Sequence, residues 1–453
     1  MRYDYVIIGN SAGGIGCIEA IRELDEASSV AIIAAEKYHA YSRALIPYYL
    51  DSKIELDKIY YRPPDFYEKM DVDAYLGVKA VGIDVSSREV LLENGGRIGF
   101  GKLLIATGGR PFIPPIEGLS GQKNVFTFLK LDDAIGVKEA IKSAGSAIVL
   151  GGGIIGLMVA EVLRRKSIEV TVVELADRVL APVVDATTSN LVQEKFAENG
   201  VKIILQNTIT KVVGEEEVEK VILKDGSELP TDLLILAVGV RPNTEVVRDT
   251  PIKVNRGIVV NKHMETSVEG IYACGDCAEI YDFVFGANRV LPLWPTAYVG
   301  GRVAGFNMCG RRREYTYATS MNAMHFFDLY IVSAGLNVPN DSDEFEILYT
   351  LDERRRIYRK FALKDGQIAG FILAGRVDRA GILLKLMKEG VNVSEFKDRL
   401  LKEDFGYADL PEEIRWELLG DKVKLGVVYE YEHGYEHGHG RAACEGRCEG
   451  HEA

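Results

Sequence analysis

The stretch that decides the fold is Tyr5-Val6-Ile7-Ile8-Gly9-Asn10-Ser11-Ala12-Gly13-Gly14. A short β-branched run leads into a glycine-rich turn, and the helical pattern of residues 15–24 follows. A second apolar run, residues 30–35, ends at Glu36. A strand, a tight turn, a helix and a strand with an acidic end form the layout of a dinucleotide-binding βαβ unit.

The same layout returns later in the chain. The apolar run 147–150 precedes Gly151-Gly152-Gly153-Ile154-Ile155-Gly156, and a helix is expected to about Arg165. The next apolar run, 169–173, ends at Glu174. In addition, residues 102–111 match residues 232–242 at their apolar, Gly and Arg-Pro positions. The chain therefore contains an internal repeat, and each copy closes with a strand running into a glycine turn.

Glycine-rich turns before helices suit a diphosphate, because a helix N-terminus offers free N–H groups and glycine lets the backbone approach closely. The second turn satisfies G-x-G-x-x-G, whereas Ser11 departs from it in the first. Glu36 and Glu174 could each accept hydrogen bonds from a ribose, the alternative being a solvated strand end. A carboxylate at Glu174 would repel the 2′-phosphate of NADP, although the nearby Arg178 leaves NADP use open. The sequence predicts two dinucleotide sites, with NAD favoured at the second.

Composition narrows the class of protein. The 453 residues are 47% hydrophobic and 27% charged, with a formal net charge of −13, so a folded protein without a basic surface for nucleic acid is expected. The longest uncharged stretch, 143–160, contains the second glycine cluster, and no membrane span is predicted. Few cysteines and a start without a signal-like pattern favour the cytoplasm.

The pattern changes after about Tyr315. Expected strands at 344–351, 357–363 and 368–373 precede expected helices at 380–389 and 393–401, which indicates a separate α+β domain. The last 25 residues are nearly free of aliphatic side chains and are predicted to be disordered. No metal site is assigned to the folded part. The tail supplies candidate zinc or nickel ligands, against the alternative of a solvated end: His433, His437, His439, Cys444 and Cys448.

Together these motifs resemble those of the pyridine nucleotide-disulfide oxidoreductases, flavoproteins with a glutathione-reductase-like fold. The chain is most similar to the group of NADH oxidases, rubredoxin reductases, nitrite reductase flavin domains and coenzyme A-disulfide reductases. The segments that carry the resemblance are 9–14, 106–108, 151–156, 239–243 and 273–276.

The resemblance covers residues 1 to about 420 and implies an α/β protein with two Rossmann-like domains and a C-terminal α+β domain. The implied boundaries are 1–115 with 240–314 for an FAD-binding domain, 116–239 for an NAD-binding domain, 315–425 for a C-terminal interface domain and 426–453 for the tail.

The resemblance also implies the residues of both sites. FAD is expected on Gly9, Asn10, Ser11, Gly13 and Gly14 through its diphosphate, on Glu36 through its adenosine ribose, on Asp276 through its ribityl chain, on the backbone of Ala80, Ala106 and Thr107, and near Arg43 and the helix containing Ala297. NAD(H) is expected on Gly151, Gly153, Gly156 and Glu174, with Gly239 near the nicotinamide. No catalytic side chain is expected, because the flavin carries the hydride chemistry.

Ala44 stands where the coenzyme A-disulfide reductases of this group carry a redox cysteine, so direct transfer from reduced flavin to an acceptor is expected. Cys274 and Cys277 are expected to be buried packing residues, and His325 a hydrogen-bonded core histidine. Met158 replaces a glutamate that many relatives place near the nicotinamide.

The function expected is an FAD-dependent NADH:acceptor oxidoreductase, with oxygen, a quinone-like molecule or a small redox protein such as rubredoxin as acceptor. One alternative is a flavin subunit of a larger redox complex, and another is a non-catalytic NAD-sensing flavoprotein. A homodimer is favoured on the resemblance alone.

Overall fold

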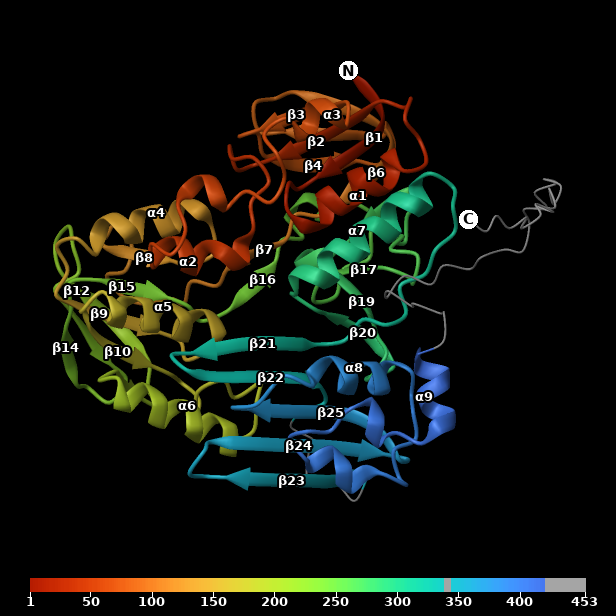
Figure 1. Cartoon of the computed structure of the whole chain (residues 1–453). Coiled ribbons are helices and arrows are strands. Elements are labelled where there is room, and N and C mark those ends of the chain that lie inside the picture. The colour runs from red at the N-terminus through yellow and green to blue at the C-terminus, as the bar shows by residue number, and fades with distance from the viewer. Residues whose placement is uncertain (338–343, 420–453) are drawn as a thin grey trace, which may run out of the picture.

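The computed structural model describes residues 1–337 and 344–419. Figure 1 shows three regions: a first α/β unit at the top, a second α/β unit at the left, and a C-terminal sheet with helices at the bottom. The predicted fold class, two Rossmann-like units followed by an α+β domain, is confirmed.

The first α/β unit is built on a sheet in the order β3-β2-β1-β6-β5-β4, with β18 also pairing β6. The strands β3, β2, β1, β6 and β18 run parallel to one another. β5 pairs antiparallel with β6, and β4 pairs antiparallel with β5. These strands are β1 (Arg2–Ile8), β2 (Val30–Ala34), β3 (Val72–Leu76), β4 (Ala80–Asp84), β5 (Glu89–Leu92), β6 (Arg97–Ile105) and β18 (Ile271–Ala273). Short helix α3 (Phe66–Lys69) and a small sheet complete the unit: β17 (Ile258–Val259), β19 (Ala278–Asp282) and β20 (Ala287–Val290). Another short helix, α2 (Ile46–Leu50), packs against the helices of the second unit instead.

Two helices of this unit, α1 (Ala12–Arg22) and α7 (Trp294–Met308), pack directly against each other. A Cβ built on Gly301 would lie 1.9 Å from the Gly13 carbonyl oxygen, and one on Gly305 would lie 2.7 Å from that of Cys17. Glycine is therefore required for the two backbones to approach this closely.

The second α/β unit has a five-stranded, fully parallel sheet in the order β11-β10-β9-β15-β8. Its order matches β3-β2-β1-β6 of the first unit, which confirms the internal repeat. The elements are β8 (Val125–Thr127), α4 (Leu131–Ala140), β9 (Ser146–Leu150), α5 (Ile154–Arg165), β10 (Glu169–Val173), α6 (Ala186–Glu198), β11 (Lys202–Ile204) and β15 (Leu234–Leu236), with a small antiparallel sheet of β12 (Ile209–Val213), β13 (Lys220–Leu223) and β14 (Glu228–Pro230).

The second unit is inserted into the first. The chain leaves through β7 (Gly109–Pro111) and returns through β16 (Val240–Pro242), and the two strands pair antiparallel near the centre of Figure 1. The residues just before β7 and just after β16 are therefore close neighbours.

The C-terminal domain contains an antiparallel sheet in the order β21-β22-β25-β24-β23. Its elements are β21 (Met321–Phe326), β22 (Leu329–Gly335), β23 (Glu346–Asp352), β24 (Ile357–Lys364), β25 (Gln367–Ala374), α8 (Ala380–Lys388) and α9 (Glu412–Leu419).

The helix expected over 393–401 was wrong. Only Lys397–Leu401 is helical, and it is a 3₁₀ helix. The Ser394 N–H bonds to the Asn392 side chain, and the Val393 N–H bonds to the Gly366 carbonyl, so these residues form a turn against the β24–β25 hairpin. Local side-chain bonding competes with helix formation here.

A buried polar cluster joins the second unit to the C-terminal domain. Asp185, at the N-terminus of α6, accepts hydrogen bonds from the Tyr358 hydroxyl at 2.7 Å and the Lys360 ammonium at 3.0 Å. It also accepts from the Thr188 N–H at 3.0 Å. Burial works against the charge, but these partners outweigh it and lower the pKa of Asp185.

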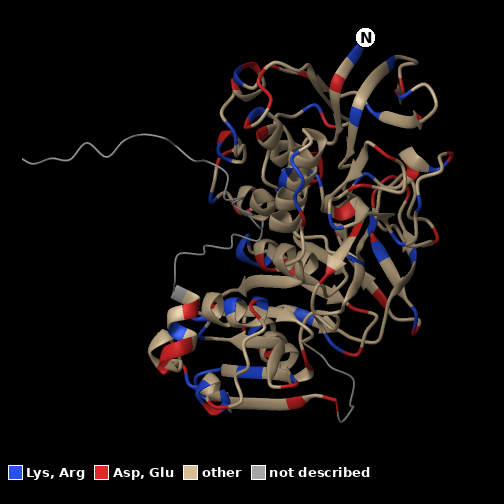
Figure 2. Ribbon diagram, turned by 90° about the vertical axis from the view of Figure 1, so that its right-hand side faces the viewer, with Lys and Arg blue, Asp and Glu red and all other residues tan. Residues whose placement is uncertain are grey.

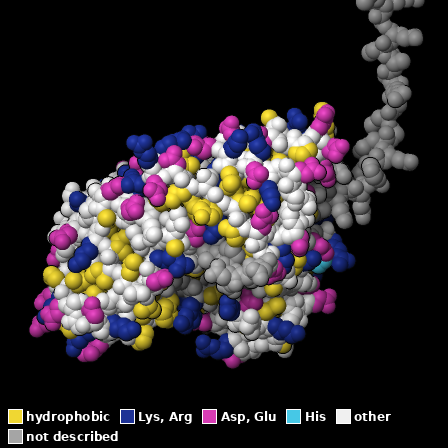
Figure 3. Space-filling model, turned by 90° about the horizontal axis from the view of Figure 1, so that it is seen from below, with side chains coloured by type: hydrophobic (Ala, Val, Ile, Leu, Met, Phe, Trp, Pro, Cys, Tyr) yellow, Lys and Arg dark blue, Asp and Glu magenta, His cyan; other side chains and the backbone are white. Residues whose placement is uncertain are grey.

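Charges of both signs are interspersed along the ribbon in Figure 2 and over the face seen from below in Figure 3. The face in view thus carries no basic stripe of the kind that tracks a nucleic acid. Among the described residues, no helix is long and apolar enough to cross a bilayer.

Candidate functional site

The first predicted turn packs backbone against backbone. Gly9 has φ +119°, and a Cβ there would lie 2.0 Å from the Ala106 carbonyl oxygen. A Cβ on Gly14 would lie 1.9 Å from the Gly9 carbonyl oxygen. Ser11 is the N-cap of α1, and within the described residues its side chain makes no capping hydrogen bond. The N–H groups of the first helical turn are thus available to an anion.

Three elements meet at this turn. The Cβ position of Gly13 lies 2.6 Å from Cys274 Sγ, 3.3 Å from the Ala297 carbonyl oxygen and 3.5 Å from Ala106 Cβ. The structure thereby brings the ends of β6 and β18 and the first turn of α7 together around the start of α1. Ala80 lies at the start of β4.

Glu36 is bound by side chains. Its carboxylate accepts from Arg43 Nη2 at 2.6 Å and from the Tyr41 hydroxyl at 2.7 Å. Arg43 also donates to the Leu129 carbonyl at 2.7 Å, and Tyr41 accepts from the Leu131 N–H at 3.2 Å. Burial opposes the Arg43 charge, but Tyr41, Glu36 and Asp276 outweigh it and raise the pKa of Arg43.

Asp276 lies in the 3₁₀ turn Gly275–Cys277, which follows β18. Burial raises the pKa of Asp276 above its ordinary value, and the positive charge of Arg43 opposes that shift. Arg43 therefore interacts electrostatically with both Glu36 and Asp276, the two carboxylates predicted to hold the ends of one cofactor.

Sequence reasoning missed the tyrosine that fixes Asn10. The Tyr67 hydroxyl donates to Asn10 Oδ1 at 2.7 Å and accepts from the Ala40 N–H at 3.2 Å. The Asn10 amide in turn donates to the Tyr38 carbonyl at 3.2 Å. The only signal was the density of tyrosines between residues 38 and 67.

The N-terminus of α7 faces the same region. Trp294 stacks on Tyr298 with ring centroids 5.8 Å apart and meets Tyr61 edge-on at 5.4 Å. Among the described residues, the Trp294 ring N–H and the Tyr61 hydroxyl are buried without a hydrogen-bond partner. Pro295 occupies the first turn, which contains no acidic residue, so the positive end of the helix dipole is uncompensated there.

The second turn has the same backbone geometry with more open space. Gly151 has φ +115°, and its Cβ would lie 2.4 Å from the Ala237 carbonyl oxygen. A Cβ on Gly156 would lie 2.0 Å from the Gly151 carbonyl oxygen. In contrast, Gly153, the N-cap of α5, has no described atom within 4 Å of its Cβ position. Gly239 has φ +114° and is equally open among the described residues.

Glu174 is bound by backbone rather than by side chains. Its carboxylate accepts from the Gly152 N–H at 2.5 Å and from the Ala176 N–H at 2.8 Å. The predicted ribose acceptor is thus tied directly to the glycine turn. Arg178 bonds its neighbour Asp177 at 2.9 Å.

The expected burial of Cys274 and Cys277 is confirmed. Cys274 and Cys277 are fully buried, and burial raises the pKa of both thiols. Ala44 lies in the 3₁₀ turn Arg43–Leu45, beside the Glu36–Arg43 pair.

His325 was wrongly expected to be a hydrogen-bonded core residue. It is only partly buried. Its ring stacks on that of Tyr330 with centroids 5.6 Å apart, and its centroid lies 6.4 Å from that of the Tyr48 ring. The alternating pattern of β21 places it at the seam with α2 rather than inside the C-terminal core.

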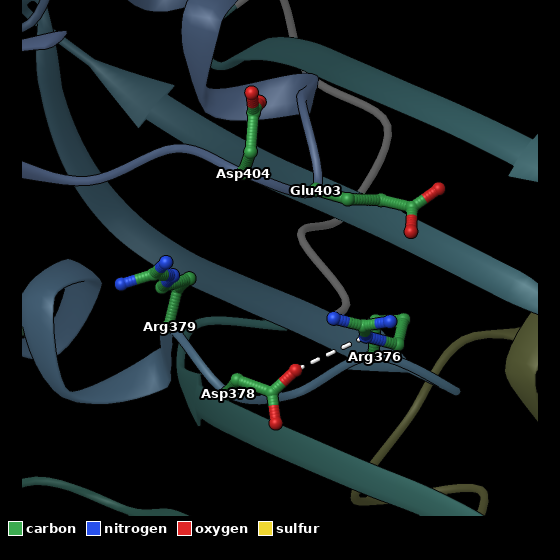
Figure 4. Close-up of a pocket in the computed structure, with 5 residues that line it drawn as sticks. All are labelled: Arg376, Asp378, Arg379, Glu403 and Asp404. Atoms are coloured by element: carbon green, nitrogen blue, oxygen red, sulfur yellow. Dashed lines mark hydrogen bonds and ion pairs between the residues drawn. The ribbon is translucent and has the colours of Figure 1, made fainter.

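A pocket of about 440 Å³ lies away from both turns, in the C-terminal domain. Figure 4 shows its two arginines and three carboxylates, with Arg376 bonded to Asp378 at 3.1 Å. Its opposite charges nearly balance, so it offers no clear preference for an ionic ligand. In residues 1–337 and 344–419 no cluster of His, Cys, Asp or Glu is placed to hold a metal, and the tail candidates His433, His437, His439, Cys444 and Cys448 lie outside the described residues.

Comparison with known proteins agrees with this geometry. The family model described as pyridine nucleotide-disulphide oxidoreductase matches residues 3–301. The chain belongs to this family. A second model, the rubredoxin NAD⁺ reductase C-terminal domain, matches residues 321–391.

Two relatives illustrate the range of the family. The chain is 31% identical over 392 residues to nitrite reductase [NAD(P)H] of Bacillus subtilis, covering 86% of this chain and 48% of that protein. It is 32% identical over 340 residues to NADH oxidase of Methanocaldococcus jannaschii, covering 73% of this chain and 75% of that one. The chain therefore spans about half the length of the nitrite reductase that it matches.

Solved structures give the same fold. An NAD-dependent persulfide reductase from A. fulgidus matches with a TM-score of 0.81 and 27% identity, covering 88% of this chain and 79% of that one. NADH:rubredoxin oxidoreductase from Clostridium acetobutylicum matches with a TM-score of 0.71 and 26% identity, covering 87% of this chain and 97% of that one.

Family membership implies the use of FAD and NAD(P)H, and the residues present fit both. The first turn has a free helix N-terminus beside buried, unpartnered donors, and the second has an open helix N-terminus beside a fixed carboxylate.

Proposed function

We propose that this oxidoreductase binds FAD on the first unit and NADH on the second, and passes electrons from the reduced flavin directly to an acceptor without a redox thiol. Bound FAD would supply the hydride and electron chemistry. The chain's own residues hold the two nucleotides, orient them and exclude water.

The first-unit assignment rests on the carboxylates at the two ends of the site. Glu36, at the end of β2, and Asp276, after β18, both interact with Arg43 and suit hydroxyl groups of a ribose and a ribityl chain. The N-terminus of α7, with its free positive dipole end, suits negative charge that develops on a reduced ring. These roles, like those of Asn10, Ser11, Ala80 and Thr107, are proposals.

The observation that carries direct transfer is Ala44. Ala44 is next to Arg43, at the position that the resemblance assigns to the redox cysteine of the coenzyme A-disulfide reductases, and alanine offers no redox chemistry. The described cysteines closest to the site, Cys274 and Cys277, are fully buried with raised pKa values, which suppresses the reactive thiolate.

We favour a small redox protein as acceptor over oxygen. The support is the match of the C-terminal domain to the rubredoxin NAD⁺ reductase C-terminal domain and the likeness to NADH:rubredoxin oxidoreductase. The test is an anaerobic acceptor screen after reduction by NADH. Rubredoxin should reoxidise the flavin at least tenfold faster than air-saturated buffer; a faster reaction with oxygen would reverse this choice.

A second candidate function is the flavin subunit of a larger redox complex. The nitrite reductase relative is about twice as long as the part this chain covers. Affinity purification from the source cell would decide: a stoichiometric redox partner would favour the subunit, and an isolated chain that turns over with rubredoxin would favour the enzyme.

The C-terminal domain is proposed to pair two chains. β23 is an edge strand, and Tyr349 on it is 66% exposed. Edge strands with exposed apolar side chains are prone to pairing. Sedimentation velocity over a range of concentrations tests this, and a monomer throughout would remove it.

A further inference from the structure

The two connections between the α/β units form one compact junction. β7 leads out of the first unit and β16 leads back, and they pair with Val240 opposite Pro111, Arg241 opposite Arg110 and Pro242 opposite Gly109. The Phe112 N–H adds a bond to the Gly239 carbonyl at 2.9 Å. Any rotation of one unit against the other must strain this junction.

Asn243 is the first residue after β16, and it bonds back to the residues just before β7. Its side-chain amide donates to the Thr107 carbonyl at 3.1 Å, and its backbone N–H donates to the Gly108 carbonyl at 2.9 Å. Its own carbonyl accepts from the Thr107 hydroxyl at 2.6 Å. Three hydrogen bonds thus join one residue to two consecutive residues on the other connection.

The residues held by Asn243 continue directly into the proposed flavin site. Thr107 follows Ala106, whose carbonyl oxygen is packed against Gly9. The Cys277 thiol, next to Asp276, donates to the carbonyl of Ile105 at 3.5 Å, two residues before Thr107. On its other side, Asn243 directly follows β16, and the first residue of that strand, Val240, comes directly after Gly239. Asn243 therefore lies between the backbone segments of the two proposed sites.

We propose that Asn243 is a positioning residue for hydride transfer: by holding Thr107 and Gly108 it sets the orientation of the second unit, and hence of the nicotinamide, relative to the flavin. The proposal rests on the proposed function. Hydride transfer requires reacting atoms about 3–3.5 Å apart, and a displacement of about 1 Å can lower the rate about a hundredfold. A residue that fixes the junction affects this step without touching either cofactor.

The test compares Asn243→Ala with Asn288→Ala. Asn288, an exposed residue, serves as the control because its amide also donates to backbone carbonyls, those of Val260 at 2.7 Å and Glu279 at 3.2 Å, but within one unit. Anaerobic stopped-flow absorbance gives the limiting rate of flavin reduction and the Kd for NADH. Reoxidation by ferricyanide and FAD content are measured on the same samples.

Asn243→Ala is expected to lower the limiting rate of flavin reduction about tenfold to a hundredfold. FAD content, the Kd for NADH and the rate of reoxidation should stay within about twofold of wild type, as should every property of Asn288→Ala. Fluorescence anisotropy of the bound flavin supplies a readout independent of turnover, and it should fall in Asn243→Ala alone because the site next to Thr107 is held less firmly.

Flavin reduction within twofold of wild type with unchanged anisotropy would overturn the proposal. Equal loss in both half-reactions together with FAD release would also overturn it, because that pattern indicates a structural role only. If Asn243→Ala does not fold, Thr107→Val removes the 2.6 Å bond at nearly constant volume, and a normal reduction rate in that variant overturns the proposal. Failure of NADH to reduce the wild-type flavin would instead refute the proposed function, and the anisotropy comparison would still decide the role of Asn243.

Discussion

The two nucleotide-binding turns share a sequence pattern but differ in their surroundings. In the first, α1 is buried between the sheet and α7, and the Cβ position of Gly13 meets Cys274, Ala297 and Ala106. In the second, the Cβ position of Gly153 meets no described atom, and Ile155 on the first turn of α5 is 37% exposed. A closed site suits a cofactor that stays bound, and an open one suits a nucleotide that exchanges at each turnover.

The glutamates that follow the second strand of each unit also differ, in the groups that bind their carboxylates. Glu36 is held by the side chains of Arg43 and Tyr41, whereas Glu174 is held by the N–H groups of Gly152 and Ala176. The first arrangement links three long side chains into one hydrogen-bonded cluster. In the second arrangement the carboxylate is bound by backbone N–H groups, and the turn is bounded mainly by backbone. The same sequence motif therefore suits slow exchange of the bound nucleotide in the first unit and fast exchange in the second.

The largest effect is expected from adding a methyl group to each turn. Gly9→Ala places Cβ 2.0 Å from the Ala106 carbonyl at a positive φ, and the overpacking should cost about 3 kcal/mol and abolish FAD retention. Gly153→Ala meets open space but places alanine at an N-cap, so stability should fall by no more than about 1 kcal/mol while the KM for NADH rises about tenfold. Thermal melting, FAD content and initial rates measure these outcomes. Equal behaviour of the two variants would contradict the contrast between closed and open turns.

Next in size is the effect of Asp276→Ala. Loss of hydrogen bonds between a charged carboxylate and the ribityl chain should weaken FAD binding by about 1.5–3 kcal/mol, roughly tenfold to over a hundredfold in Kd. FAD titration of the apoprotein by fluorescence quenching measures it. Asp84→Ala serves as control: Asp84 ends β4, and its carboxylate accepts from the N–H groups of Ser86 and Ser87. Unchanged FAD affinity in Asp276→Ala would show the ribityl assignment to be wrong.

Nucleotide preference tests the open site. NADH should exceed NADPH in kcat/KM by about 1–3 kcal/mol, roughly tenfold to over a hundredfold, because Glu174, the proposed ribose acceptor, would repel a 2′-phosphate. Glu174→Gln should reduce that ratio about tenfold. Glu169→Gln, exposed at the other end of β10, should leave it unchanged. A wild-type ratio of one would remove the role given to Glu174.

Low pH should weaken the interactions of Asp185 that join the second unit to the C-terminal domain. The pKa of Asp185 is lowered in the folded protein, so the stabilisation is fully present above its unfolded value near 4 and is lost as pH falls through the lower folded pKa. Asp185→Asn should therefore lower stability by about 1–3 kcal/mol at pH 7 and by much less below about pH 3. Melting curves of both proteins across this range test it; a difference independent of pH would point to packing instead of charge.

The smallest effect is expected from the cysteines. Replacing Cys17, Cys274, Cys277 and Cys309 by Ala should change acceptor reduction by no more than a few-fold, provided FAD stays bound. The NADH half-reaction and the acceptor half-reaction are measured separately. A collapse of the acceptor half-reaction alone would reintroduce a redox thiol and point first to Cys274 or Cys277.

Sequence reasoning succeeded where local chemistry is decisive. Gly9, Gly14, Gly151 and Gly156 could be placed because only glycine tolerates the close carbonyl contacts that each turn makes. It failed at residues 393–401, where an apolar pattern suggested a helix but Asn392 and Gly366 fix a turn. It also missed Tyr67, because nothing in its neighbourhood in the chain shows that it reaches Asn10.

The sequence by itself determined that two βαβ units occur in one chain, that each ends its second strand in a glutamate, and that alanine occupies position 44, because these features lie within short windows of periodic pattern. Only the tertiary structure decided which partners those residues have. Arg43 joins Glu36 to Asp276, and Asn243 joins the return connection to Thr107, across 136 residues of chain. Such contacts depend on the pairing of β18 with β6 and of β16 with β7, strands that are far apart in the sequence. This pairing is set by the packing of whole sheets, which no local sequence pattern encodes.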